Sequence, residues 1–550
     1  MSGLHDLRPI HKGDSGCSIP QSIRASFTDS TEKIPMTNSD TNAMWSYHNL
    51  TKHSSHSIRA SRHYLDWSNQ PSPFKSYQSI EPIALPHSLV QTLAPALEVV
   101  ASTGVESNKE KKPDLLQLAS ILYYSAGVTK HKAYPGGVIY FRAAACAGAL
   151  YPVEVYVVCD DIEGLAAGVY HFNPADFALR PLREGDFRSV LARATGENSQ
   201  VSSAPVTLIF TGISWRSSWK YRDRAYRYHF WDNGMILANA LAMAAAHELP
   251  AEIVMGFVEA DLNKLMGIDG QQELALSLFT LGRVDDGFQE SVSIDALPEL
   301  SFEVAPVSRF PVDYPSIREM HLASSLSDVD DVRAWRGTKI NLTSPAPEGE
   351  EFKLSPTPNE TLPKEAIEDV IQRRASTRRF ARKPITLIDL SLIIDRATRG
   401  IKTDFLKDER NRINDIYAIV NAVEGLPTGA YFYRNETRAL ELLKQGDFRE
   451  EAAYLTLEQD LGGDASVTFF LMADLNRVVE SYGNRGYRAA QMEAGVIGGK
   501  MYLAAYALKR GATGLTFYDD DVTEFFSPHA AGKSCMLVVS VGMTGKRPLL

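Results

Sequence analysis

The feature that most restricts how this chain can fold is an internal repeat with a constant spacing of 261 residues. The block GDFR at 185–188 returns at 446–449. Five further residues return in the same order, with Tyr221, Arg224, Tyr226, Arg227 and Gly234 matched by Tyr482, Arg485, Tyr487, Arg488 and Gly495. A fixed offset across several elements indicates a duplicated domain. We therefore expect an intramolecular pseudo-dimer, in which one polypeptide carries the two-fold symmetry of a homodimer.

The apolar pattern divides the chain into two similar units. Helical spacing predicts helices at 115–127 and 232–247, and apolar runs predict strands at 153–158, 168–172, 206–211 and 274–281. Scattered Pro, Ser and acidic residues after 282 predict a long connector. We expect a flexible leader at 1–43, a first domain at 44–282, the connector at 283–360 and a second domain at 361–550.

The charge and the cysteine content exclude several functions. A net charge of −10 over 550 residues argues against a general nucleic-acid binder, because phosphate contacts need a basic face. The four cysteines form no CxxC pair, so we expect no metal site, no disulfide framework and a cytoplasmic location. His48, His53 and His56 lie in a polar stretch and are expected to be solvated. No apolar stretch reaches the roughly 20 residues that a membrane span needs.

A run of small residues distinguishes the first copy from the second. The sequence RAAACAGALYP at 142–152 leads directly into an apolar strand, so the backbone there is free of bulky side chains and can approach a flat ligand. Close packing against a helix is the alternative interpretation. The second copy has lost about 11 residues before this point and carries charged residues at 409–415 instead.

Two clusters of polar residues also occur in only one copy. The second copy opens with RRASTRRF at 373–380, and arginines with hydroxyls in so short a run suit a phosphate group. A solvated basic helix end would give the same pattern. The first copy alone has a lysine before the repeated tyrosine, Lys220-Tyr221 against Ser481-Tyr482. A half-buried lysine can move protons near neutral pH, whereas a surface lysine beside a core tyrosine is the alternative.

At these residues the chain resembles the FMN-dependent nitroreductase superfamily, in particular its SagB-type branch of azoline dehydrogenases. The segment RRASTRRF is similar to the FMN-phosphate segment of that family. The segment RAAACAGALYPVEVYVV is similar to its flavin-contacting loop, with two departures at Ala145 and Cys146. Lys220-Tyr221 resembles the Lys-Tyr pair implicated in catalysis, and LDWSNQPSPF at 65–74 is typical of the branch.

The resemblance implies an α+β fold of two nitroreductase-like domains, each with a mixed, mostly antiparallel central sheet flanked by helices. Homodimers of the family build two flavin sites at their interface, and here the intact parts fall on complementary copies, which implies one FMN site. The second copy would supply cofactor contacts from Arg374, Ser376, Arg378, Gly514, Leu515 and Thr516, with Lys546, Arg547 or Lys533 as further phosphate partners. The first copy would supply Arg142, Cys146, Ala147 and Gly148, and the catalytic pair Lys220 and Tyr221.

The function implied is an FMN-dependent dehydrogenase that oxidises azoline rings of a peptide or peptide-like substrate to azoles, in the biosynthesis of ribosomally made peptide products. Such an enzyme would work with cyclodehydratase-type partner enzymes. Two alternatives stay open: an NAD(P)H-dependent nitro or quinone reductase, and a flavin-free scaffold protein of a biosynthetic complex.

Overall fold

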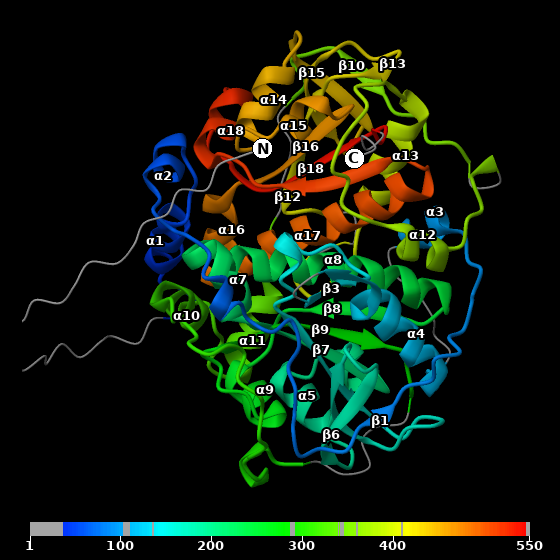
Figure 1. Ribbon diagram of the computed structural model, residues 1–550, viewed down its shortest axis with the longest axis vertical. Coiled ribbons are helices and arrows are strands. Elements are labelled where there is room, and N and C mark those ends of the chain that lie inside the picture. The colour runs from blue at the N-terminus through cyan, green and yellow to red at the C-terminus, as the bar shows by residue number, and fades with distance from the viewer. Residues whose placement is uncertain are drawn as a thin grey trace, which may run out of the picture. The chain divides into compact units, whose positions relative to one another are not determined.

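The predicted duplication is visible as two seven-stranded sheets with the same strand order in a computed structural model of the chain (Figure 1). The structure describes residues 37–102, 110–134, 137–285, 292–338, 340, 346–358, 361–406, 408 and 411–545. The strands of the first sheet, in spatial order, are β1 (Ile83–Ala84), β6 (Ala178–Glu184), β5 (Gly168–Asn173), β4 (Val153–Cys159), β7 (Val206–Ile213), β9 (Glu273–Leu281) and β8 (Ala251–Val254).

The second sheet repeats this order with the strands of the second half. They are β10 (Glu351–Lys353), β15 (Ala439–Gln445), β14 (Gly429–Arg434), β12 (Asn414–Val420), β16 (Val467–Ala473), β18 (Ser534–Gly542) and β17 (Gly511–Leu515). Neighbouring strands pair antiparallel throughout both sheets, and helices flank them. The predicted α+β fold of two similar domains is confirmed.

The two halves meet along their longest helices, α8 (Ala225–Ala246) and α17 (Asn484–Ala507), which lie between the two sheets (Figure 1). Gly234 and Gly495 sit where these helices cross, and a Cβ added to Gly234 would lie 2.6 Å from the Cα of Gly495. Both helices are buried over almost their whole length. The duplicated glycines therefore allow the backbones of the two halves to come into direct contact.

The other helices surround these layers. In the first half and the connector they are α1 (Asn42–Leu50), α2 (Ser55–Ala60), α3 (Ala96–Val100), α4 (Leu115–Ala126), α5 (Arg188–Ala194), α6 (Ser199–Ser203), α7 (Ser214–Tyr221), α9 (Glu259–Met266), α10 (Pro315–Ala323) and α11 (Val329–Gly337). In the second half they are α12 (Ile367–Arg373), α13 (Leu387–Thr398), α14 (Arg449–Leu455), α15 (Asp460–Asp464), α16 (Leu475–Tyr482) and α18 (Asp519–Phe526). Within the described part of the chain, no helix is long and apolar enough to cross a membrane.

The structure differs from the sequence-based boundaries in two places. The connector at 283–360 contains α10, α11 and the edge strand β10. Part of the segment assigned to the leader is folded, because Asn38 accepts a hydrogen bond from the backbone N–H of Arg485, 2.7 Å away, and α1 begins at Asn42. Both segments have short elements with little apolar periodicity, which the sequence pattern does not reveal.

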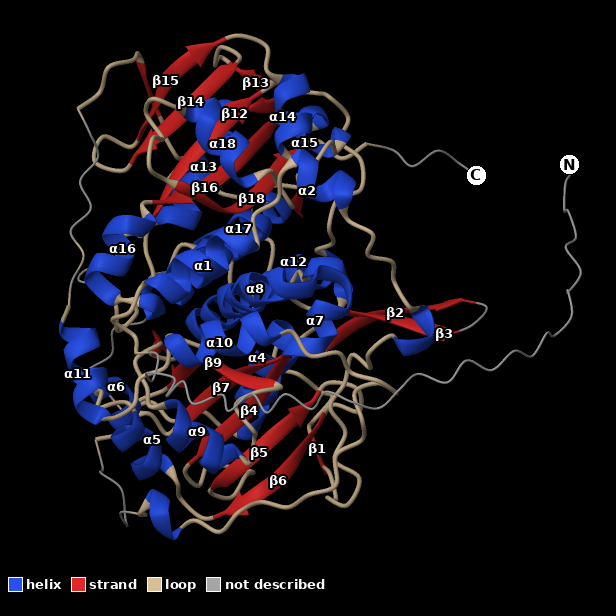
Figure 2. Cartoon of the chain, turned by 90° about the vertical axis from the view of Figure 1, so that its left-hand side faces the viewer, coloured by secondary structure: helices blue, strands red, loops and turns tan. Residues whose placement is uncertain are grey.

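A two-stranded hairpin, β2 (Val128–Tyr134) and β3 (Gly137–Arg142), lies in the first half and has no counterpart among the described residues of the second. It extends away from the first sheet (Figure 2). Val138 and Ile139 on it are 44% and 46% exposed. The end of β3 leads directly into the loop of small residues, so the residues missing from the second copy correspond to this hairpin.

Candidate active site

The loop of small residues has an unusual backbone. Gly148, Ala149 and Tyr151 have φ angles of 63°, 54° and 50°, in the left-handed region that non-glycine residues rarely adopt. Such conformations persist only where the surroundings hold them in place, and they cluster at functional sites. The loop is held from below by Asp232 on α8, whose carboxylate accepts the Ala147 N–H at 2.9 Å and the Cys146 S–H at 3.2 Å.

Arg142 supports the same loop from the inside. Its guanidinium is buried and donates to the carbonyl oxygens of Val153, at 3.1 Å, and Pro73, at 2.6 Å. The side chain therefore joins β3, β4 and the segment ahead of the first sheet. These two bonds fix the start of the loop against the neighbouring segments.

Arg374 brings the second half to this loop. Its Nε and Nη2 donate to the carbonyl oxygens of Ala143, at 2.9 Å, and Arg142, at 3.0 Å. Ser376 Oγ lies 3.5 Å from the hydroxyl of Tyr502, which also accepts the backbone N–H of Gly514. The phosphate-type segment, the loop and the β17 edge thus meet where the two halves join, as the complementary differences between the copies predict. We refer to this meeting region as the cleft.

Lys220 and Tyr221 lie at the end of α7 and face the same loop. A Cβ added to Gly148 would lie 2.8 Å from the Tyr221 hydroxyl and 3.4 Å from Lys220 Nζ. The Tyr221 ring stacks on Tyr228 with centroids 4.1 Å apart. Glycine at 148 therefore leaves the backbone open toward both side chains.

The electrostatics give Lys220 and Tyr221 different protonation behaviour. Burial, and next the charge of Arg378, lower the pKa of Lys220. Burial, followed by Tyr228, raises the pKa of Tyr221 well above its usual value. Lys220 is thus the group that more readily becomes a neutral base, whereas Tyr221 stays protonated and can donate a hydrogen bond.

The β17 edge borders the cleft with Gly514, Leu515 and Thr516. Gly514 is exposed, and Thr516 Oγ1 lies 3.3 Å from His53 Nδ1. Burial, and next Arg224, lower the pKa of His53 to about 3, so its imidazole is neutral. His53 is a neighbour of the cleft that sequence reasoning missed.

One of the predicted phosphate partners, Lys533, lies elsewhere. Lys533 Nζ donates to Asp415 and to the Tyr417 hydroxyl, at 2.7 and 2.9 Å, and has no bond to Arg374 or Ser376. Lys546 and Arg547 fall outside the described residues.

Asp232 is a second residue that sequence reasoning missed. Burial raises its pKa to about 7. Its counterpart at the 261-residue offset is Glu493 on α17, which accepts the backbone N–H groups of Ile413, at 2.9 Å, and Asn414, at 2.8 Å. Each half thus holds the segment before its central strand with a carboxylate from its long helix. An acidic residue at equivalent positions of the two long helices is the signal that could have revealed it.

The donor set of the cleft fits a phosphate-bearing group. Arg374 and Arg378 contribute positive charge, and Ser376 adds a neutral hydroxyl. Lys130 on β2 lies near the same positive charges. Burial, followed by the charges of Arg374 and Arg373, lowers its pKa. Arginine and hydroxyl donors of this kind recognise phosphate.

The two α+β halves each contribute residues to the cleft, which lies at their pseudo-two-fold interface. The model of the nitroreductase family matches residues 109–283 and 371–543, more than half of the chain, which therefore belongs to the nitroreductase family. A nitroreductase-like protein of known structure from Anabaena variabilis matches with a TM-score of 0.72 and 26% identity, covering 92% of this chain and 99% of that one.

Three curated proteins are similar to parts of the chain. The nitroreductase-like protein MJ1384 of Methanocaldococcus jannaschii is 30% identical over 169 residues, covering 31% of this chain and 80% of that protein. The microcin B17-processing protein McbC of Escherichia coli is 29% identical, covering 28% of this chain and 57% of McbC. The trifolitoxin-processing protein TfxB of Rhizobium leguminosarum bv. trifolii is 31% identical, covering 34% of this chain and 53% of TfxB. The chain thus spans about half the length of the last two.

Proposed function

We propose that the chain is an FMN-dependent dehydrogenase that oxidises azoline rings of a peptide or peptide-like substrate to azoles. The observation that carries the proposal is the cleft in which Arg374 of the second half bonds the loop of the first half, with Lys220 beside Gly148. Relatives named for the processing of microcin B17 and trifolitoxin support a peptide substrate. We propose in addition that the chain works with cyclodehydratase-type partner enzymes, as the resemblance of its motifs implies.

The residues of the cleft fit FMN in two parts. Arg374, Ser376 and Arg378 would hold the phosphate, since they combine charged and neutral donors on one short segment. Cys146, Ala147 and Gly148 on one side, and Gly514, Leu515 and Thr516 on the other, would hold the ring with backbone groups. Arg142 would act through the loop that it supports.

Converting an azoline to an azole removes two electrons and two hydrogens from the ring, one as a proton and one as a hydride. Bound FMN supplies the acceptor for the hydride. Lys220 would take the proton from the substrate Cα carbon, because its lowered pKa makes a neutral amine accessible. Tyr221 stays protonated and would orient the ring nitrogen or a neighbouring carbonyl by donating a hydrogen bond.

A nitro or quinone reductase that uses NAD(P)H is the second candidate. The match to MJ1384, named as a nitroreductase and covered over 80% of its length, supports it. Steady oxidation of NADPH with a quinone, without turnover of a thiazoline peptide, would favour this candidate over the first.

The cofactor is tested by replacing Arg374. We expect Arg374→Ala to weaken FMN binding by about 10- to 100-fold, since each charge-assisted hydrogen bond contributes about 1.5–3 kcal/mol. The Kd is measured by quenching of flavin fluorescence. Arg382→Ala is the matched control, because Arg382 is exposed and pairs with Asp464 away from the loop. Colourless protein that takes up no added FMN would contradict the proposal and favour a flavin-free scaffold.

The support that Asp232 gives to the loop predicts a second effect on binding. Asp232→Asn keeps the shape but cannot accept from both the Ala147 N–H and the Cys146 S–H. We expect FMN to bind about tenfold more weakly, in line with one lost buried hydrogen bond. Glu493→Gln alters the equivalent carboxylate of the other half and should leave the Kd within about twofold. Equal losses in both variants would show a general effect on stability instead.

A further inference from the structure

The internal two-fold defines a second position equivalent to the β17 edge of the cleft. After β17 come Phe517 and Asp519, and after β8 come Phe257 and Glu259. Each acidic residue pairs with two arginines at the start of the opposite long helix or in the turn just before it, Asp519 with Arg224 and Arg227, and Glu259 with Arg485 and Arg488. Asp519 and Glu259 are 260 positions apart in the sequence. At the same spacing, Leu515 corresponds to Met255 and Thr516 to Gly256.

At this second position the backbone donors already have an acceptor. The Asp404 carboxylate accepts the N–H of Met255 at 2.9 Å and the N–H of Gly256 at 2.8 Å. Thr403, the residue before it, lies beside Ile253 as a short parallel extension of the β8 edge. Asp404 is 9% exposed. A carboxylate of the chain is therefore bound where the open cleft presents Leu515 and Thr516.

Tyr482, the equivalent of Tyr221, is hydrogen-bonded to the segment that contains Asp404. The Tyr482 hydroxyl donates to the carbonyl oxygen of Phe405 at 2.6 Å. Phe405 is 1% exposed, and Trp335 of the connector packs on Tyr482 and Phe405 with ring centroids 5.6 and 6.4 Å away. Tyr221 faces an open glycine instead, so the two equivalent tyrosines have opposite surroundings.

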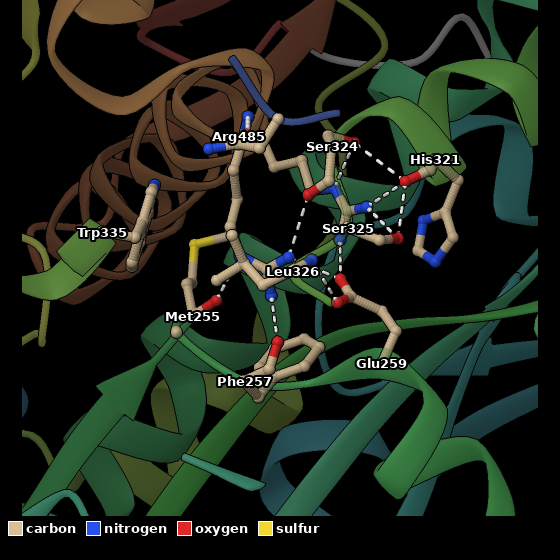
Figure 3. Close-up of polar contacts among 12 residues, drawn as sticks. Met255, Phe257, Glu259, His321, Ser324, Ser325, Leu326, Trp335 and Arg485 are labelled. Carbon is tan, nitrogen blue, oxygen red and sulfur yellow. Dashed lines mark hydrogen bonds and ion pairs between the residues drawn. The ribbon is translucent and has the colours of Figure 1, made fainter. Parts of the chain in front are cut away.

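The connector covers this position from outside. Arg485 donates to the carbonyl oxygens of Met255, at 2.6 Å, and Ser324, at 2.9 Å, and Leu326 donates its N–H to Glu259 at 3.0 Å (Figure 3). Trp335 lies against Arg485, with the guanidinium carbon 5.7 Å from the ring centroid. The connector thus holds the β8 edge, Asp404 and Phe405 as one packed unit.

One residue at the second position differs in charge from its counterpart in the cleft. In the open cleft the N–H of Thr377, within the phosphate-type segment, donates to the carbonyl of Ala512 at 2.9 Å. The residue equivalent to Ala512 is Glu252, which is buried and whose pKa is raised to about 7 by burial and next by Asp404. A carboxyl group thus stands where the cleft has a methyl group, and Lys402 and Arg336 lie close enough to lower its pKa.

We propose that the second cofactor position is permanently filled by the chain itself, with Asp404 as an internal ligand and Phe405 behind it, so that each chain holds one FMN. The number of flavins rests on the proposed function, whereas the filling of the position does not. The segment that makes the β2–β3 hairpin in the first half is shortened in the second and runs inward along β8. The same segment of the repeat thus forms a hairpin beside the cleft in the first half and fills the second position in the second half.

Flavin counting on the full chain gives the first test. Titration with FMN should reach one FMN per wild-type chain, and one per Arg374→Ala chain with a Kd about 10- to 100-fold higher, in line with one site. Two FMN per chain, or one that binds Arg374→Ala with the wild-type Kd, would overturn the inference. A wild-type chain that binds none contradicts the proposed function, and the exchange experiment then decides the inference.

Hydrogen exchange tests the internal ligand without reference to activity. In the wild type we expect slow exchange at Met255 and Gly256 with or without FMN, and exchange at Leu515 and Thr516 that FMN slows. Asp404→Ala should speed exchange at Met255 and Gly256 at least tenfold, and Asp404→Asn, which keeps the volume, by a smaller factor. Fast exchange at Met255 and Gly256 in the wild type, slowed by added FMN, would overturn the inference.

Discussion

Lys220→Ala is expected to lower kcat for oxidation of a thiazoline or oxazoline peptide by about 10²- to 10⁴-fold, the range for a lost general base. FMN should stay bound, because Lys220 lies beside Gly148 on the first half, whereas the phosphate-type segment belongs to the second. Single-turnover bleaching of the flavin absorbance measures the step directly. The variant protein should be as yellow as the wild type.

The pH profile identifies the role of Lys220. A protonated lysine cannot accept a proton, so kcat/KM of the wild type should fall as pH drops through the Lys220 pKa, which burial and Arg378 place below its usual value. This fall of kcat/KM at low pH should be absent in Lys220→Ala. Ser481→Ala is the matched control, because Ser481 occupies the equivalent place in the half with the filled position. Turnover of Lys220→Ala within about threefold of the wild type would remove Lys220 from the proposed mechanism.

Much of this arrangement could be predicted from the sequence because duplication leaves a numerical signature. Tyr221 and Tyr482 share an offset with Gly234 and Gly495, and that offset fixes the pairing of the halves before any contact is known. The loop at 142–152 occurs only in the first copy and the segment with Arg374 only in the second, which indicates that the two serve one site. The structure brings these residues together, with Arg374 bonded to the carbonyl of Ala143.

The residues that sequence reasoning missed act through contacts between distant segments. Asp404 lies in a short stretch without periodicity, and only the β8 edge 148 positions earlier reveals what its carboxylate binds. His53 was expected to be solvated, yet it lies beside Thr516 because the start of the chain packs on the second half. His48 is fully buried for the same reason. Residue type and spacing carry no record of such long-range partners.

The crossing of α8 and α17 predicts the second large effect. Gly495→Ala should lower the free energy of unfolding by about 2–3 kcal/mol, because the added Cβ would lie 2.6 Å from the Trp231 carbonyl oxygen and force two helix backbones apart. In a helix without such a contact, replacing glycine by alanine raises stability by about 1 kcal/mol. A loss of stability would therefore show that the helix contact, and not helix propensity, determines the result. Urea denaturation measures the change.

The same substitution should also weaken FMN binding, since separating the helices moves Arg374 of one half away from Ala143 of the other. Gly337→Ala is the matched control: it lies at the end of α11, and a Cβ there meets nothing within 4 Å. That variant should be as stable as the wild type or slightly more so. If Gly495→Ala were equally stable and kept its FMN affinity, the two halves would not depend on this helix contact to form their shared cleft.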